Sequence, residues 1–222
     1  MAAFWKDKKM AGAIGATGGK FALVGVALML HGRIDGNDVR MAIMPGSPTS
    51  AITPDLADHV RARSNRPDVA IHLRAESFRA RISAVEAGPA GDAQVTIGQD
   101  ILADNAIEFD FVHHQALPLS ASEARSLERR SRPISVHREP NGIFSVTLEQ
   151  GGKAPVHAQL DLALAAGVVT PMLAIGTTIK VGGVDLPRVD VRAGAQPVVG
   201  LYAFKHVGVI FDFGHDRIWV RQ

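Results

Sequence analysis

The chain contains no cysteine, and this absence removes several kinds of chemistry at once. Disulfide bonds, thiolate metal sites and cysteine nucleophiles all need the missing side chain. The compartment stays open, because a protein without cysteine folds equally well in reducing and in oxidising surroundings. The nine histidines are scattered, and no His-x-x-x-His or Glu-His pair stands at metal-ligand spacing. The sequence therefore predicts no metal site and no other cofactor.

The chain also lacks a strong excess of one charge. It has 24 basic and 22 acidic residues. Nucleic-acid-binding domains usually cluster Lys and Arg on one face, with aromatic residues interleaved. The densest basic stretch, LERRSRP at residues 127–133, is short and contains its own Glu. We therefore expect a solvated linker at that point and no nucleic-acid partner.

Long hydrophobic runs are missing as well. Within residues 1–30, Lys20 divides the apolar stretch into pieces that are shorter than the ~20 residues a membrane-spanning helix needs. We therefore expect no transmembrane segment. The basic start followed by small and apolar residues is also typical of a processed leader for export to the periplasm or outside the cell, but no small-residue cleavage site follows cleanly. A flexible lead-in over residues 1–20 is the favoured interpretation, with an export leader as the alternative.

The chain does contain an internal repeat. Residues 97–117, IGQDILADNAIEFDFVHHQAL, align without gaps on residues 199–219, VGLYAFKHVGVIFDFGHDRIW. Each copy has a Gly, a short helical or turn segment, a strand that contains Asp, a polar turn and a final apolar strand. The matched positions include Gly98 with Gly200 and Asp110 with Asp212. A repeat of this kind indicates two structural units of similar plan.

The segments upstream of the two copies also correspond. Residues 26–44 and residues 143–161 each read as a β-hairpin, with turns at Asp35-Gly36 and Gly151-Gly152. After the first hairpin, Thr53 and Pro54 are typical of a helix cap and of the first residue of a helix.

The segment between the two halves, residues 119–134, is charged and predicts a linker with a short helix. The chain thus divides into a lead-in over residues 1–20, a first lobe over 21–118, the linker, and a second lobe over 135–222. With 46% hydrophobic residues, the chain has enough apolar side chains to give two such lobes a core.

Both copies of the repeat resemble the closing segment of a lobe in the pepsin and retropepsin families of aspartic proteases. In those families a hydrophobic-Gly-x-x-x-Leu segment precedes a strand of the type hydrophobic-x-hydrophobic-Asp, and residues 97–111 and 199–220 are similar to it. The resemblance covers about residues 22–222. It implies a mostly β, two-lobed, pepsin- or retropepsin-like β-barrel fold with short helices and a cleft between the lobes.

The resemblance also implies where the signature turn of the family, Asp-Thr/Ser-Gly-Ala/Ser, lies in the first lobe. There Met44 stands at the position of the catalytic Asp and Pro45 at that of the Thr, whereas Gly46 and Ser47 fit the pattern.

In the second lobe the resemblance places Asp161 on the other catalytic Asp. Leu162 and Ala163 replace the Thr/Ser and the Gly that should follow it. If the resemblance holds, residues 44 and 161 should face one another at the floor of the cleft, with Cα atoms within roughly 10 Å, since the dyad holds two carboxylates about 3 Å apart.

Aspartic proteolysis needs both carboxylates, because they share one proton and act as general base and general acid. Met44 can do neither. The favoured hypothesis is therefore a non-catalytic pseudoprotease that binds an extended peptide or protein segment in the cleft. One alternative is an active aspartic endopeptidase that uses Asp161. A second alternative is a structural scaffold protein whose cleft binds nothing.

Overall fold

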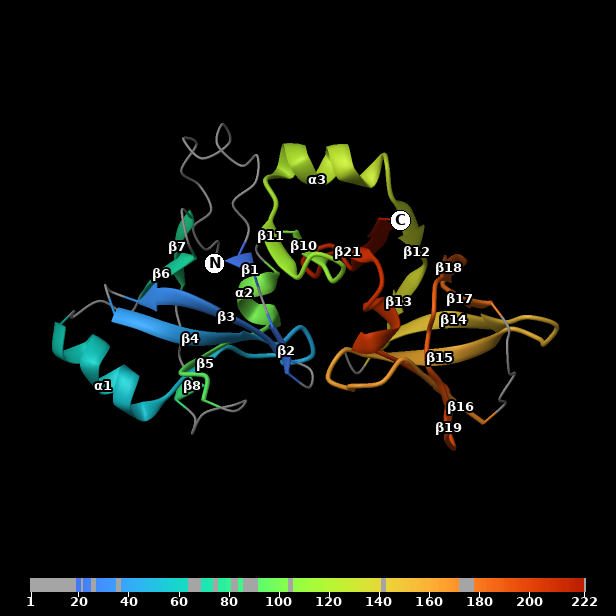
Figure 1. Cartoon of the computed structure of the whole chain (residues 1–222), viewed down its shortest axis with the longest axis horizontal. Coiled ribbons are helices and arrows are strands. Elements are labelled where there is room, and N and C mark those ends of the chain that lie inside the picture. Colours follow the sequence, from blue (N-terminus) through green and yellow to red (C-terminus); the bar gives the residue numbers. More distant parts are fainter. Residues whose placement is uncertain are drawn as a thin grey trace.

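A computed structural model gives the fold of the chain. It describes residues 19–221 apart from 21, 25–26, 35–36, 64–68, 74–75, 81–83, 86–91, 104–105, 141–142 and 172–177. The protein is mostly β, and its strands form three sheets. Figure 1 shows one sheet in each half of the chain, at the left and right of the view, and a third sheet between them below α3.

The first half of the chain contains an eight-stranded sheet with the order β7-β6-β3-β4-β9-β5-β8, in which β2 also pairs with β3. Its strands are β2 (Ala22–Val24), β3 (Ala27–Ile34), β4 (Asn37–Ile43), β5 (Ala51–Ile52), β6 (Val69–Leu73), β7 (Glu76–Ala80), β8 (Ala84–Val85) and β9 (Val95–Ile97). β3 and β4 form the predicted hairpin, because Ile34 lies opposite Asn37. The predicted turn residues Asp35 and Gly36 lie outside the described residues.

The second half contains another eight-stranded sheet, with the order β18-β17-β14-β15-β20-β16-β19 and β13 paired with β14. Its strands are β13 (Val136–Arg138), β14 (Phe144–Gln150), β15 (Val156–Asp161), β16 (Val168–Thr170), β17 (Ile179–Val181), β18 (Val184–Leu186), β19 (Val191–Ala193) and β20 (Val198–Gly200). Each strand of this order has a counterpart at the same place in the first sheet. The predicted turn after β14 uses Gly152 at a φ of 77°, a left-handed conformation that glycine adopts without strain.

The third sheet joins the two halves, with the order β1-β11-β10-β21-β22-β12. Its strands are β1 (Gly19–Lys20), β10 (Ile107–Asp110), β11 (Gln115–Pro118), β12 (Arg132–Ile134), β21 (Gly208–Asp212) and β22 (Arg217–Arg221). The central pair, β10 and β21, is antiparallel, with Ile107 opposite Phe211 and Phe109 opposite Val209. In the sequence repeat Ile107 corresponds to Val209 and Phe109 to Phe211. Exchanging the two strands therefore leaves the set of paired positions unchanged. This register fits an approximate two-fold relation between the halves; superposition of the two copies stays a prediction.

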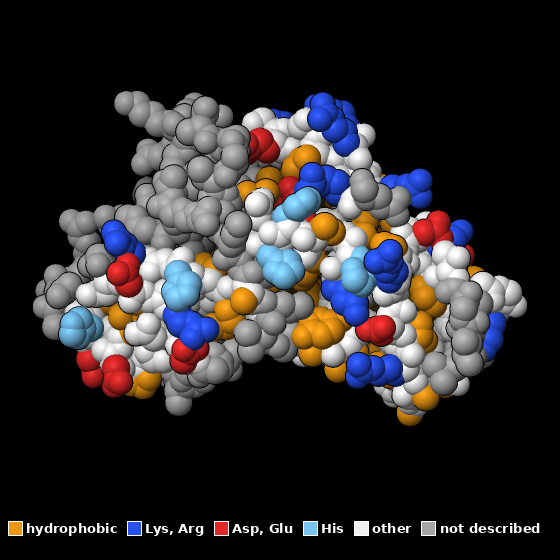
Figure 2. Space-filling model, viewed as in Figure 1, with side chains coloured by type: hydrophobic (Ala, Val, Ile, Leu, Met, Phe, Trp, Pro, Cys, Tyr) orange, Lys and Arg blue, Asp and Glu red, His pale blue; other side chains and the backbone are white. Residues whose placement is uncertain are grey.

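The edge strands of the third sheet come from segments that the sequence did not mark as strands. β1 lies at the end of the predicted lead-in, and β12 lies at the end of the predicted linker. The linker also forms a helix before β12, α3 (Ala121–Glu128). Ser120, which caps this helix, and Glu123 make a reciprocal capping box. Figure 2 shows basic side chains over α3, at the top of the view. Arg129 and Arg130, at the end of this helix, are exposed, as a solvated linker predicts.

The other helices follow the sequence signals. α1 (Pro54–Arg63) begins at Pro54, as predicted. The Ala57 N–H donates to the Thr53 carbonyl over 2.9 Å. The short helix α2 (Gln99–Leu102) and the 3-10 helix η1 (Leu201–Phe204) each begin after a glycine of the repeat, in matching places. Within the described ranges, no helix has the length and apolar character needed to cross a bilayer.

The apolar core runs from both lobes into the third sheet, where it becomes aromatic. The rings of Phe109 and Phe211 have centroids 5.8 Å apart, and Phe211 also stacks on Phe213 at 5.3 Å. Phe204 meets the ring of Phe211 edge-on at 6.0 Å. All four rings are buried. Because burying a Phe contributes about 2 kcal/mol, these rings stabilise the third sheet, and the contact of Phe109 with Phe211 joins the two halves.

Candidate functional site

Met44 and Asp161 occupy corresponding places in the two lobes. β4 runs parallel to β9, and β15 runs parallel to β20, so each lobe ends its second hairpin strand at the same point of its sheet. Ile43, which precedes Met44, lies opposite Ile97. Leu160, which precedes Asp161, lies opposite Val199, the counterpart of Ile97 in the repeat. The Met44 N–H then donates to the Ile97 carbonyl over 3.0 Å, whereas Asp161 lies opposite Gly200.

The first turn is held by backbone and amide contacts. The Ser47 N–H donates to the Met44 carbonyl over 2.9 Å, which closes a tight turn around Pro45 and Gly46. Gln99 secures this turn from α2, because its Nε2 donates to the Pro45 carbonyl over 2.7 Å and its backbone N–H donates to the Ser47 carbonyl over 2.8 Å. The Ser47 hydroxyl donates locally, to the Thr49 carbonyl at 2.8 Å.

The side chain of Met44 lies at the edge of a small apolar cluster. It is partly buried. The cluster consists of Ala27, Met29, Ala42 and Ala93. This packing is the ordinary behaviour of a thioether next to buried methyl groups.

The second turn is held by the carboxylate of Asp161 itself. Its Oδ1 accepts a hydrogen bond from the Ala163 N–H at 2.9 Å, and its carbonyl accepts one from the Leu164 N–H at 3.1 Å. This is the local hydrogen bonding by which Asp stabilises turns. Leu162 is buried, and Ala163 is exposed.

The two turns touch each other. An ideal Cβ built on Gly46 would lie 2.3 Å from the backbone nitrogen of Ala163 and 2.7 Å from its Cβ. The two lobes therefore approach closely at this point, and the approach depends on Gly46. At Ala163, where the pattern has Gly, the methyl group is accommodated.

Substitution Gly46→Ala is expected to destabilise the protein by about 2 kcal/mol, because an added methyl group would force the turns apart. Urea denaturation measures this loss. The added Cβ collides with a backbone atom, so the double variant Gly46→Ala/Ala163→Gly should remain destabilised. Ala163→Gly alone is the control and should change the free energy of unfolding by less than ~1 kcal/mol. Full rescue in the double variant would contradict the backbone contact.

A groove of about 370 Å³ lies beside the paired turns and between the lobes. Its lining from the first lobe is Gly46, Pro48 and Gln99, and its lining from the second lobe is Arg138, Ile143, Phe144, Gln159, Leu160, Asp161 and Leu162. Of the predicted signature positions, Gly46, Asp161 and Leu162 thus line the groove. Met44 is not among its lining residues.

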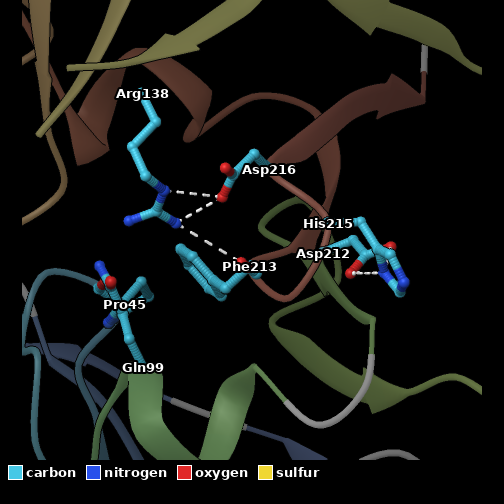
Figure 3. A network of polar contacts seen from close by, with 7 residues as sticks. All are labelled: Pro45, Gln99, Arg138, Asp212, Phe213, His215 and Asp216. Atoms are coloured by element: carbon cyan, nitrogen blue, oxygen red, sulfur yellow. Dashed lines mark hydrogen bonds and ion pairs between the residues drawn. The ribbon is translucent and has the colours of Figure 1, made fainter. Parts of the chain in front are cut away.

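Arg138 is the charged residue of the groove lining that the sequence pattern did not indicate. Its Nε donates to Asp216 Oδ1 over 2.8 Å, and its Nη2 donates to the Phe213 carbonyl over 3.5 Å. The guanidinium carbon also lies 4.2 Å from the centroid of the Phe144 ring, a cation–π arrangement. Figure 3 shows Arg138 reaching toward the turn of Phe213 and Asp216, with Pro45 and Gln99 of the first lobe nearby. The residue comes from β13, whose short sequence carries no motif.

Asp161 and Arg138 are the only ionisable residues among the described residues that line this groove. Arg138 has an ion-pair partner in Asp216. In the described part of the chain, no ion pair involves Asp161. The same described residues contain no group of three or more His, Asp or Glu that could hold a metal ion. The chemistry that the groove offers is therefore one partly buried carboxylate, one paired guanidinium, two side-chain amides and apolar walls.

Comparison with known proteins gives a fold and no family. No family model matches the chain, and no curated protein matches it in sequence. Among solved structures, basic 7S globulin from soybean is similar over 89% of this chain and 91% of its own, with a TM-score of 0.56 and 7% sequence identity. That structure has a pepsin-like fold. This protein therefore has the mostly β, two-lobed, pepsin-like fold with short helices, the scaffold of the aspartic proteases.

Proposed function

We propose that the protein is a pseudoprotease that binds an extended peptide or protein segment in the groove between its lobes and does not cleave it. The observation that carries this proposal is the groove itself, whose described lining contains one carboxylate, Asp161, beside the paired turns. The position that corresponds to it in the other lobe is Met44.

The chemistry of the scaffold supports the non-catalytic part of the proposal. An aspartic dyad works because two adjacent carboxylates cannot both ionise, so one accepts a proton from water while the other donates one to the peptide carbonyl. A thioether does neither. The hydroxyl that normally follows each Asp is also absent, because Pro45 and Leu162 stand there.

The shape and lining of the groove support the binding part. Ligand sites are concave and combine apolar surface with a few polar groups that fix orientation. Here Ile143 and Phe144 supply apolar surface, and the amides of Gln99 and Gln159 can donate to and accept from a peptide main chain. We assign the first lobe to residues 21–118, the linker to 119–134 and the second lobe to 135–222; the matching strand orders support this division.

A binding assay with a groove-filling variant tests the proposal. A library of fluorescent extended decapeptides is screened against the purified protein, and hits are measured by fluorescence polarisation. The substitution Gln159→Trp, which places an indole in the groove, should weaken binding about tenfold, a loss of roughly 1.4 kcal/mol. Thr147→Trp is the matched control, because Thr147 is exposed on the neighbouring strand β14 and does not line the groove.

The two alternatives give different results in the same assay. A structural scaffold would bind no decapeptide above background. An active endopeptidase would bind peptides and release shorter products. Equal weakening by Gln159→Trp and Thr147→Trp would mean that peptides bind elsewhere.

A further inference from the structure

We infer that the groove selects segments that carry a Lys or Arg side chain, and that Asp161 is the residue that recognises the positive charge. This inference rests on the proposed function and adds the chemical class of the ligand. It begins from a carboxylate that lines a groove and has no counter-ion among the described residues.

The carboxylate of Asp161 is held in place by its own turn. The Ala163 N–H donates to Oδ1 at 2.9 Å and fixes the direction of the group. No hydrogen bond from another described residue reaches Oδ2. A carboxylate that is oriented by one backbone N–H and has an oxygen left for a ligand can accept a charge-assisted hydrogen bond, which is stronger than a neutral one.

The other charge at the groove does not cancel this preference. Arg138 is engaged by Asp216 and lies over the ring of Phe144. Glu139, which follows Arg138 in the chain, accepts hydrogen bonds from Ser145 and His157 and does not line the groove. The first lobe contributes no ionisable group to the described lining. The unbalanced charge that faces a bound segment is therefore negative.

The apolar walls suit the stem of a long basic side chain. Lys and Arg commonly lay their methylene groups on apolar surface while the charged head reaches a polar partner. Ile143, which is exposed, and Phe144 line the same groove as Asp161. A Lys or Arg stem can therefore pack on this wall while its head meets the carboxylate.

The test compares peptides that differ at one side chain only. The best decapeptide is made with Lys, norleucine or Glu at each position in turn, and dissociation constants are measured with the full chain at low and at physiological ionic strength. At one position the Lys peptide should bind about tenfold tighter than the norleucine peptide, and salt should reduce this ratio. The Glu peptide should be the weakest of the three.

Variants assign the preference to its residue. In Asp161→Asn the ratio between the norleucine and Lys dissociation constants should fall to about one, because the amide keeps the size of the side chain and loses its charge. Glu149→Gln, on β14 of the same lobe and outside the groove lining, should keep the wild-type ratio. Thermal unfolding of both variants checks that they are folded.

The outcomes separate this inference from the proposed function. Binding with no preference for Lys, with a preference for Glu, or with a Lys preference that survives Asp161→Asn would overturn the inference and leave peptide binding in place. If the library yields no decapeptide that binds, both the inference and the proposed function fail.

Discussion

Purified protein is expected to show no pepstatin-sensitive proteolysis above background at any pH from about 3 to 8, the range over which carboxylate dyads titrate. The reason, under the proposed function, is that Met44 stands where a dyad would need the second carboxylate. A single carboxylate cannot form the shared-proton pair. It could accept a proton from the attacking water, but no second group would donate a proton to the peptide carbonyl. Each such proton-transfer role is worth roughly 10²- to 10⁴-fold in rate. A fluorogenic peptide library, assayed with and without pepstatin and beside pepsin as a positive control, measures this.

Adding one carboxylate should not produce cleavage. In Met44→Asp the first turn would gain a carboxylate, but Pro45 and Leu162 would still offer no hydroxyl to link the turns. Ala163 would also keep its methyl group against Gly46. Met44→Asp should therefore stay at background in the same assay. Wild-type cleavage that disappears in Asp161→Asn would refute the pseudoprotease hypothesis and favour the endopeptidase.

The parts of the fold that could be predicted are those with a local signal. The two hairpins follow from alternating apolar residues around glycine-containing turns, and α1 begins where Thr53 and Pro54 indicate. The closing strands could be found because their phenylalanines recur at the same spacing in both halves. These signals also led to the pepsin-like fold, which the structural comparison supports at only 7% identity. A fold can therefore leave a readable pattern when very few residues are shared.

The parts that could not be predicted depend on long-range contacts. β1 and β12 are short strands at sheet edges, and only their pairing with β11 and β22 makes them strands. Arg138 lines the groove because β13 brings it beside the turn of Asp216, 78 positions away in the chain. The contact of Gly46 with Ala163 joins two lobes, and only the resemblance indicated that these two turns would meet. No local pattern of residue types carries such information.

The centre of the third sheet holds a second feature that sequence could not indicate, a buried pair of carboxylates bridged by one cation. Glu108 and Asp110 project from β10 with side chains 4% and 7% exposed. Arg221 of β22 contacts both, with Nε 2.6 Å from Glu108 Oε1 and Nη2 2.8 Å from Asp110 Oδ2. Glu108 lies opposite Ile210, in the pairing that joins the halves of the molecule.

The two carboxyl groups respond differently to this site. Burial raises the pKa of Glu108, and the opposing charge of Arg221 offsets only part of that effect. Burial also acts to raise the pKa of Asp110, but hydrogen bonds from His113 and the charges of His113 and Arg221 outweigh it and hold that pKa below its usual value. Ionised Asp110 therefore stabilises the fold above pH ~4, the ordinary pKa of Asp, and this contribution is lost as the pH falls through the depressed pKa.

Substitution Arg221→Met is expected to cost about 3 kcal/mol of unfolding free energy at pH 7, because it leaves two buried carboxylates without their shared cation. Urea denaturation measures the loss. Arg217→Met is the matched control: this arginine lies on the same strand and is exposed, and within the described residues it has no ion pair. Its substitution should change stability by less than ~0.5 kcal/mol.

The pH dependence distinguishes charge from packing in this prediction. Without Arg221 the pKa of each carboxyl is higher than it is in the folded wild type, so the folded variant takes up protons at a higher pH than the folded wild type does. A group with a raised folded pKa contributes stability below its unfolded pKa and loses that contribution as the pH rises through the folded pKa. The difference in unfolding free energy between wild type and Arg221→Met should therefore be largest near pH 7. It should decrease toward pH ~4, where carboxyl groups take up protons. A gap of the same size at both pH values would mean that Arg221 acts through the packing of its stem, and that its charge contributes nothing to joining the two halves.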